Sequence, residues 1–151
     1  MWFRADLRTR DNVALAEATR AATRGVVGLF VVCPDQWEEH DWAAIKVDFV
    51  LRTLEELKGS LGKLGIPLLI RETGRFDGCA SVVGGVMEEC GCDALWFNRE
   101  YEWNEARRDA AVMARVEKMG KGVHACTDQV IREPGSVLTK EERWYTVYSP
   151  F

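Results

Sequence analysis

The residues Ala94–Asp109, with the sequence ALWFNREYEWNEARRD, decide how the fold is interpreted. They begin with the short apolar run Ala94–Phe97, which predicts a buried strand. A few polar residues follow, and from Trp103 the pattern becomes that of a charged helix with acidic residues near its start. In an open α/β sheet, the loop leading from the carboxyl end of a strand into a helix is where ligands bind.

Asn104 and Glu105 stand at the start of this predicted helix, where an amide and a carboxylate can face a bound planar molecule. Both residue types are also ordinary helix starters, because asparagine caps helices and the helix dipole favours early acidic side chains. Position alone therefore favours capping over binding.

The length of 151 residues corresponds to one domain, and 47% hydrophobic residues suffice for a substantial core. A net charge of −4 argues against a chain that binds DNA by itself, since such binding rests on clustered Lys and Arg. The sequence contains no run of 18 apolar residues, so no membrane-spanning helix is predicted. Charged residues occur within Met1–Asp6, too early for the apolar stretch of a secretory leader. We expect a cytoplasmic protein without a membrane partner.

Five cysteines make an odd number and include no Cys-x-x-Cys pair: Cys33, Cys79, Cys90, Cys92 and Cys126. No second Cys or His pair at zinc spacing accompanies Cys90 and Cys92. We interpret all five as reduced cytosolic thiols, mostly small buried residues, and predict no metal site.

Apolar runs and helical periodicity alternate along the chain. Strands are expected at residues 1–4, 26–33, 68–71, 93–97 and 122–126, and helices from residue 13 and over 42–63, 76–89 and 102–119. Residues 34–41 are expected to form a loop, and Asp11 or Asn12 to cap the first helix. The long helix carries an apolar stripe of Ile45, Phe49, Leu54, Leu57, Leu61 and Leu64.

This alternation predicts an α/β fold, with a Rossmann-like, doubly wound, five-stranded parallel sheet and helices on both faces. The domain is expected to occupy residues 1–128, with an irregular tail over 129–151.

The usual nucleotide and hydrolase motifs are missing. No Gly-x-Gly-x-x-Gly follows the first strand, and neither a Walker sequence nor a Gly-x-Ser-x-Gly elbow occurs. A nucleotide-binding Rossmann enzyme is thus disfavoured, and no catalytic residue is predicted. His124 is expected in the core or at a sheet end, and Trp37, Trp42 and Trp103 near the ends of strands, under loops or lining a chromophore pocket.

Several motifs together resemble the N-terminal domain of the DNA photolyase/cryptochrome family. Trp2–Asn12 looks like the family signature Trp-Phe-Arg-x-Asp-Leu-Arg-x-x-Asp-Asn. Further matching segments follow in order: Pro34–Trp37, Gly65–Leu68, Asn98–Asp109, Pro134–Thr139 and Tyr145–Phe151. The resemblance covers nearly the whole chain.

The resemblance implies a light-harvesting antenna domain, which binds a chromophore and passes excitation to FAD. In that family a separate helical domain holds FAD and, in the deoxyribodipyrimidine photo-lyases, repairs cyclobutane pyrimidine dimers in DNA. That domain would follow Phe151, so this chain is not expected to act as a lyase alone.

The resemblance also implies site residues. Members with methenyltetrahydrofolate use a histidine after the second strand and an Asn-Glu pair at the fourth helix, which match His40, Asn104 and Glu105. Adjacent donors on a pterin suit a carboxylate acceptor. With a deazaflavin or flavin antenna the loop around Trp37 would matter, and Arg8 is a further candidate. Arg4, Asp6 and Asp11 are interpreted as structural.

A rival from a different class is a chromophore-free interaction or regulatory fragment of a photolyase-like protein. An acidic surface and an aromatic tail suit docking, and an apolar face normally covered by the FAD-binding domain would favour self-association.

Overall fold

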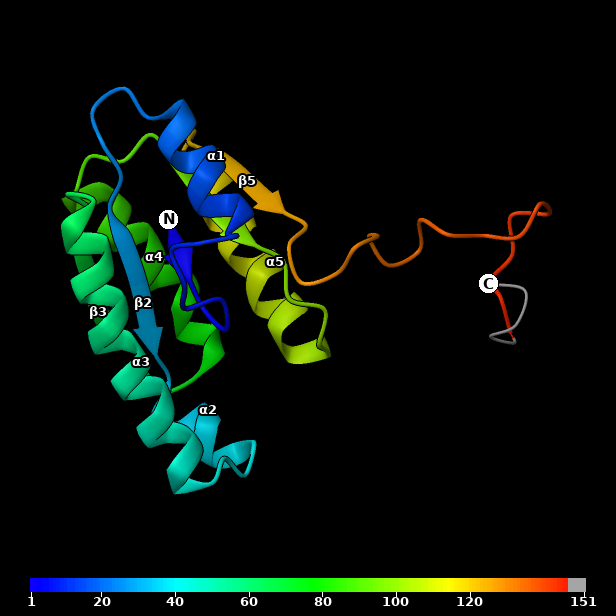
Figure 1. Ribbon diagram of the computed structural model, residues 1–151, viewed down its shortest axis with the longest axis horizontal. Helices are drawn as coiled ribbons and strands as arrows, with labels where there is room; N and C mark the ends of the chain where they lie inside the picture. Colours follow the sequence, from blue (N-terminus) through cyan, green and yellow to red (C-terminus); the bar gives the residue numbers. More distant parts are fainter. Residues whose placement is uncertain (147–151) are drawn as a thin grey trace.

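Strands and helices alternate over residues 2–126 in the computed structural model, which describes residues 1–146 (Figure 1). The strands are β1 (Trp2–Phe3), β2 (Gly28–Val32), β3 (Leu68–Glu72), β4 (Ala94–Asn98) and β5 (Gly122–Cys126). The helices are α1 (Val13–Ala21), α2 (Pro34–Glu39), α3 (Ala44–Lys63), the 3-10 turn η1 (Phe76–Gly78), α4 (Cys79–Glu89) and α5 (Trp103–Lys118). All strand pairs are parallel, so the α/β class is confirmed.

Helices cover both faces of the strands, as the doubly wound fold requires. Because side chains alternate along a strand, Leu29 and Val31 of β2 point to one face and Phe30 to the other. The first face packs on apolar residues of α4 and α5, and the second on residues of α1 and α3. Two apolar layers therefore sandwich the strands.

A continuous five-stranded sheet was expected, and this was wrong in detail. The backbone pairs β1, β2 and β3 in one sheet and β4 with β5 in another. β1 and β4 lie side by side, but β1 has only two paired residues, Trp2 and Phe3. In place of a ladder, the guanidinium of Arg4 donates to the backbone oxygen of Asn98.

A buried polar junction joins the two sheets and α1. The Asn98 amide donates to Asp6 Oδ2 at 2.7 Å and to Asn12 Oδ1 at 2.9 Å, and its oxygen accepts from the Ala14 backbone at 3.0 Å. Asn12 also accepts from Leu15 N at 3.0 Å, which confirms it as the N-cap of α1. One side chain thus fixes β4 against the loop after β1.

The expected loop over residues 34–41 contains the helix α2, which is a correction to the sequence interpretation. Pro34 occupies the first helical turn, where its fixed backbone angle and missing N–H do no harm, and Asp35 lies in the same turn. The helix has only six residues, too few to show an apolar period.

The stripe along α3 is buried only in part. Leu54, Leu57 and Leu61 are in the core, whereas Ile45 is 79% and Phe49 68% exposed. A 20-residue helix is about 30 Å long and a five-residue strand about 17 Å, so the helix extends past the sheet. Leu64, at the other end, is also exposed.

Two other expectations about burial were wrong in part. His124 does not lie in the core, which was one of the two expected positions: it is exposed and stacks on Trp96 of the neighbouring strand, with ring centroids 3.9 Å apart. It lies on β5, the end strand of its sheet, in line with the other expected position. Among the cysteines only Cys33 and Cys79 are buried, since the other three lie on a turn or on β5.

Residues 127–146 contain neither helix nor strand and run away from the domain in Figure 1. Arg99 pairs with Glu133 at 3.6 Å and holds the beginning of this tail. The expected motif at Tyr145–Phe151 lies mostly outside the described residues.

Replacing Asn98 by alanine should destabilise the domain strongly, because buried groups of Asp6, Asn12 and Ala14 would lose a partner. We expect Asn98→Ala to lower the free energy of unfolding by about 3 kcal/mol, since a buried polar group left unsatisfied costs about 1–3 kcal/mol. Equilibrium urea denaturation measures this change.

Asn104→Ala is the matched control, because this amide is exposed on α5. It should change the free energy of unfolding by less than about 0.5 kcal/mol. Equal effects of the two substitutions would show that the junction does not hold the fold.

Candidate functional site

Two of the three residues of the predicted pterin site, His40 and Asn104, meet at the carboxyl edge of the strands. His40 ends α2, which follows β2, and Asn104 begins α5, which follows β4. The Nε2 atom of His40 lies 3.0 Å from Nδ2 of Asn104. Residues separated by 64 positions in the chain thus form one contact.

Gln36 and Phe76 complete the surroundings of His40, and the sequence interpretation missed both. Gln36 is buried, and its Nε2 lies 3.1 Å from the same Nε2 of His40, while its Oε1 accepts from the Phe76 backbone at 3.3 Å. The Phe76 ring meets the His40 ring edge-on at 5.8 Å. The spacing of Gln36 and His40 would have indicated a contact, had residues 34–39 been recognised as a helix.

Two amide groups therefore converge on one imidazole nitrogen. A single ring nitrogen has one lone pair or one hydrogen in the ring plane, so it forms one strong hydrogen bond there. At least one of the amides of Gln36 and Asn104 keeps bonding capacity for another group. The arrangement leaves a polar edge at the surface of the site.

Glu105 stands next to Asn104 in the first turn of α5 and is half-buried. Its carboxylate has no hydrogen bond or ion pair with any residue of the described range 1–146. No side chain forms a capping hydrogen bond at the start of α5, where Glu102 is the N-cap residue. Within residues 1–146, no capping hydrogen bond therefore supports the interpretation of Asn104 and Glu105 as helix caps.

Trp37 faces another direction than Gln36. It is 8% exposed, packs in the core cluster with Leu54 and Leu57, and stacks on Trp42 with centroids 5.2 Å apart. The ammonium of Lys46 lies 3.5 Å above the Trp42 ring. The contacts of Trp37 are therefore those of a residue that packs in the core.

Arg8 is likewise apart from His40. Its Nε donates to the backbone oxygen of Asp11 at 3.0 Å, and its guanidinium pairs with Asp128 after β5. These bonds tie the loop after β1 to the beginning of the tail. The structure thus brings His40 and Asn104 together and gives Trp37 and Arg8 other contacts, while Glu105 is the residue that follows Asn104 in α5.

A buried ionic cluster of Arg4, Glu100, Arg108 and Asp109 holds the first turns of α5. Nε and Nη2 of Arg108 donate to Asp109 Oδ1 at 3.0 and 2.8 Å, and Nη2 also pairs with Glu100. Nη2 of Arg4 lies 3.4 Å from Asp109 Oδ2. The cluster fixes where α5 starts, and with it the position of Asn104.

Burial decides the direction of the pKa shifts of two members of this cluster, Arg4 and Asp109. It raises the pKa of Asp109, although Arg4 and Arg108 act in the opposite direction. It also lowers the pKa of Arg4 against the pull of the carboxylates of Asp109 and Glu100. Both shifts disfavour charge. At Arg108 burial also lowers the pKa, but the carboxylates of Asp109 and Glu100 outweigh it and raise the pKa above its ordinary value, so ionic attraction prevails at this member of the cluster.

The guanidinium of Arg108 also connects the cluster to the His40 surroundings. It lies 4.7 Å from the centroid of the Phe76 ring and 5.0 Å from that of Trp2. Phe76 is therefore held between a cation and the imidazole of His40.

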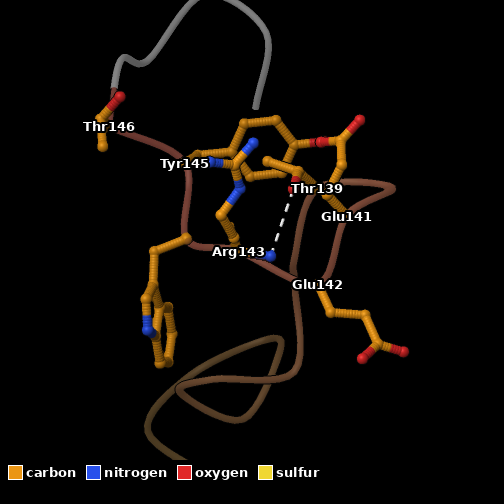
Figure 2. Close-up of a pocket in the computed structure, with 7 residues that line it drawn as sticks. Thr139, Glu141, Glu142, Arg143, Tyr145 and Thr146 are labelled. Carbon is orange, nitrogen blue, oxygen red and sulfur yellow. Dashed lines mark hydrogen bonds between the residues drawn. The ribbon is translucent and has the colours of Figure 1, made fainter.

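A separate hollow lies in the tail, far along the chain from these residues (Figure 2). It is lined by Thr139, Glu141, Glu142, Arg143, Trp144, Tyr145 and Thr146, and the Arg143 backbone donates to Thr139 Oγ1 at 3.2 Å. One short segment supplies every lining residue, so no strand end contributes to it. Residues 1–146 hold no group of three or more His, Cys, Asp or Glu side chains that could bind a metal.

Comparison with known proteins decides the family. The family described as DNA photolyase matches residues 1–151. The chain belongs to the DNA photolyase family. Its sequence is 39% identical to the deoxyribodipyrimidine photo-lyase of Salmonella typhimurium and 36% identical to that of Escherichia coli K12. Each alignment covers all of this chain and 32% of the relative, so the chain spans about a third of their length and corresponds to the N-terminal domain.

Solved structures of the photolyase family share the fold. An archaeal photolyase from Sulfolobus tokodaii, whose structure holds two FAD molecules and is described as implying a novel light-harvesting cofactor, superimposes with a TM-score of 0.77 at 26% identity. This superposition covers 91% of this chain and 31% of the Sulfolobus chain. A cryptochrome from Synechocystis has the same fold, with a TM-score of 0.75 at 18% identity over 83% of this chain and 26% of its own.

Lysine should not replace Arg108 without loss, because an ammonium can neither bridge Glu100 and Asp109 with a planar fork nor stack on Phe76. We expect Arg108→Lys to lower the free energy of unfolding by about 2 kcal/mol, the range of one hydrogen bond to a charged group. Thermal and urea unfolding report the change.

Arg107→Lys provides the control on the adjacent, exposed position of α5. It should leave stability within about 0.5 kcal/mol of the parent chain. If Arg108→Lys is equally silent, the cluster does not hold α5 in the way described.

Proposed function

We propose that this photolyase-family domain binds a light-harvesting chromophore of the pterin type, methenyltetrahydrofolate, at the surface formed by His40, Asn104 and Glu105. One observation carries the proposal: His40 contacts Asn104, and the next residue of α5, Glu105, has a half-buried carboxylate with no partner within residues 1–146. Side chains at the carboxyl edge of parallel strands are placed for binding.

The donor and acceptor types fit that ligand class. The amino-pyrimidinone edge of a pterin presents adjacent N–H donors, which a carboxylate such as that of Glu105 can accept in a bidentate manner. The amides of Gln36 and Asn104 supply polar groups beside it, and Phe76 supplies an aromatic wall. Recognition sites of this kind combine apolar walls with a few placed polar groups.

The chromophore would supply the absorption of near-ultraviolet light. This chain's residues would bind it, orient its ring plane and restrict water around its polar edge. In a complete photolyase the excitation would pass to FAD held in a separate catalytic domain, which is the partner we propose for this chain. Such transfer makes and breaks no bond, so the site needs no nucleophile or general acid.

Trp37 and Arg8 remain predictions for a deazaflavin or flavin antenna. Their contacts with Trp42 and Asp128 support structural roles instead. We therefore place the pterin ahead of the flavin-type chromophores.

A second candidate function is a chromophore-free surface for protein docking or self-association. The exposure of Ile45 and Phe49, one turn apart on α3, favours it, because large apolar side chains grouped on a surface mark interaction sites. On α5, Trp103 is also 76% exposed. A chain that never takes up a pterin and forms dimers in sedimentation would support this candidate.

None of the helices within residues 1–146 is both long and apolar enough to cross a membrane. The net charge of −4 gives no support to direct DNA binding by this chain.

The test is a titration of the 151-residue chain with methenyltetrahydrofolate, followed by absorbance and fluorescence. Glu105→Gln should weaken binding about tenfold or more, since loss of a hydrogen bond to a charged group is worth about 1.5–3 kcal/mol. The parent chain should bind saturably.

Glu102→Gln is the matched control, because Glu102 is an exposed carboxylate whose one side-chain hydrogen bond within residues 1–146 is accepted from the Tyr101 backbone. It should bind the pterin like the parent. Equal affinity of the parent and Glu105→Gln would remove Glu105 from the site, and absence of binding in all three chains would contradict the pterin proposal. Repeating the titration with a deazaflavin then tests the other antenna class.

A further inference from the structure

Two buried cysteines from distant parts of the chain meet next to the candidate site. The Sγ atoms of Cys33 and Cys79 lie 3.7 Å apart, and the residues are 2% and 1% exposed. Cys33 is the N-cap residue of α2, and Cys79 is the first residue of α4. The fold therefore places two thiols in contact across 46 positions of sequence.

The two sulfurs are not equivalent. The hydrogen bond with Cys33 lowers the pKa of Cys79, and the Arg108 guanidinium lowers it further, against the effects of burial and of Asp109 and Asp77. The same bond, with burial, raises the pKa of Cys33. Cys79 also opens a helix, where the dipole favours an anion. Cys79 is thus the sulfur of the pair whose ionisation the surroundings favour.

We propose that Cys33 and Cys79 form a thiol–disulfide site, which a peroxide converts into a disulfide within one chain. Cys79 thiolate attacks one oxygen of hydrogen peroxide; the O–O bond breaks, and the departing hydroxide takes up a proton to leave as water. The sulfur of Cys33 then attacks the resulting sulfenic acid, the S–O bond breaks, and a second water leaves as the S–S bond forms. Two sulfurs give up two electrons in total, and one peroxide accepts them.

The geometry allows this bond without a change of fold. The sulfurs must approach from 3.7 Å to about 2.05 Å, which small movements of the two chain segments can accommodate. Peroxide reaches the buried sulfurs by local opening of the six-residue helix α2. The bond would tie the segment that carries Gln36 and His40 to the one that carries Phe76. The proposal does not depend on which ligand the site binds.

The remaining cysteines differ in setting. Cys90 is exposed, and Cys92 and Cys126 are half-buried, and no S–S contact within residues 1–146 involves any of them. They can be replaced by serine together to leave Cys33 and Cys79 as the sole thiols, since none is fully buried, although Cys92 and Cys126 pack against the edges of the core.

The experiment treats the folded Cys90→Ser, Cys92→Ser, Cys126→Ser chain with hydrogen peroxide and measures intact mass and free thiols. We expect a loss of about 2 Da, the two hydrogens of an S–S bond, with disappearance of both thiols and recovery by dithiothreitol. Circular dichroism before and after treatment checks that the chain stays folded.

Single variants assign the order of the step. In the same background, Cys33→Ser should accumulate a sulfenic acid on Cys79 that dimedone labels, and Cys79→Ser should label far less. Retention of both thiols in the folded chain, at peroxide concentrations that oxidise the urea-unfolded chain, would overturn the proposal. Disulfide-linked dimers on a non-reducing gel, or oxygen addition in place of the 2 Da loss, would also overturn it.

Discussion

The amide of Asn98 is the interaction on which the domain depends. A doubly wound fold needs β1 and β4 side by side, yet the two strands share no backbone ladder. Asn98 bonds instead to Asp6, Asn12 and the backbone of Ala14, so one buried side chain joins β4, the loop after β1 and α1. A fully bonded polar junction of this kind specifies one arrangement, because any shift of register would leave its members unsatisfied.

The position of the site follows from that junction. The chain leaves Asn98, passes Glu100 and enters α5, whose first turns are held by the bonds of Arg108 to Glu100 and Asp109. The helix start, and with it Asn104, is then set relative to α2 by buried groups and not by surface loops. Removing one member of this buried cluster would leave its partners without their bonds, so the cluster resists any change in where α5 starts.

Local sequence pattern was sufficient to predict most helices and strands. It was insufficient where the length of an element, or its packing against distant residues, decides whether a helix forms or a side chain is buried. The strand Gly122–Cys126 and the end of α3 before Gly65 were predicted at the observed residues, because apolar runs and a glycine of positive φ are local signals. The helix α2 was missed, since six residues carry no period. The exposure of Ile45 depends on how far α3 extends past the strands, which no pattern within the helix records.

The candidate site shows the same difference between what local sequence predicts and what distant contacts decide. Sequence position alone could not separate capping from binding at Glu105. Within the described residues no side chain forms a capping bond at the start of α5, and this supports the binding proposal made above. Gln36 and Trp37 are adjacent in sequence and about 100° apart around a helix, so one contacts His40 while the other packs in the core. One face of α2 thus packs in the core, and another contacts His40. Its short length makes this possible, because a core residue on one face directly fixes the orientation of a polar residue on the other.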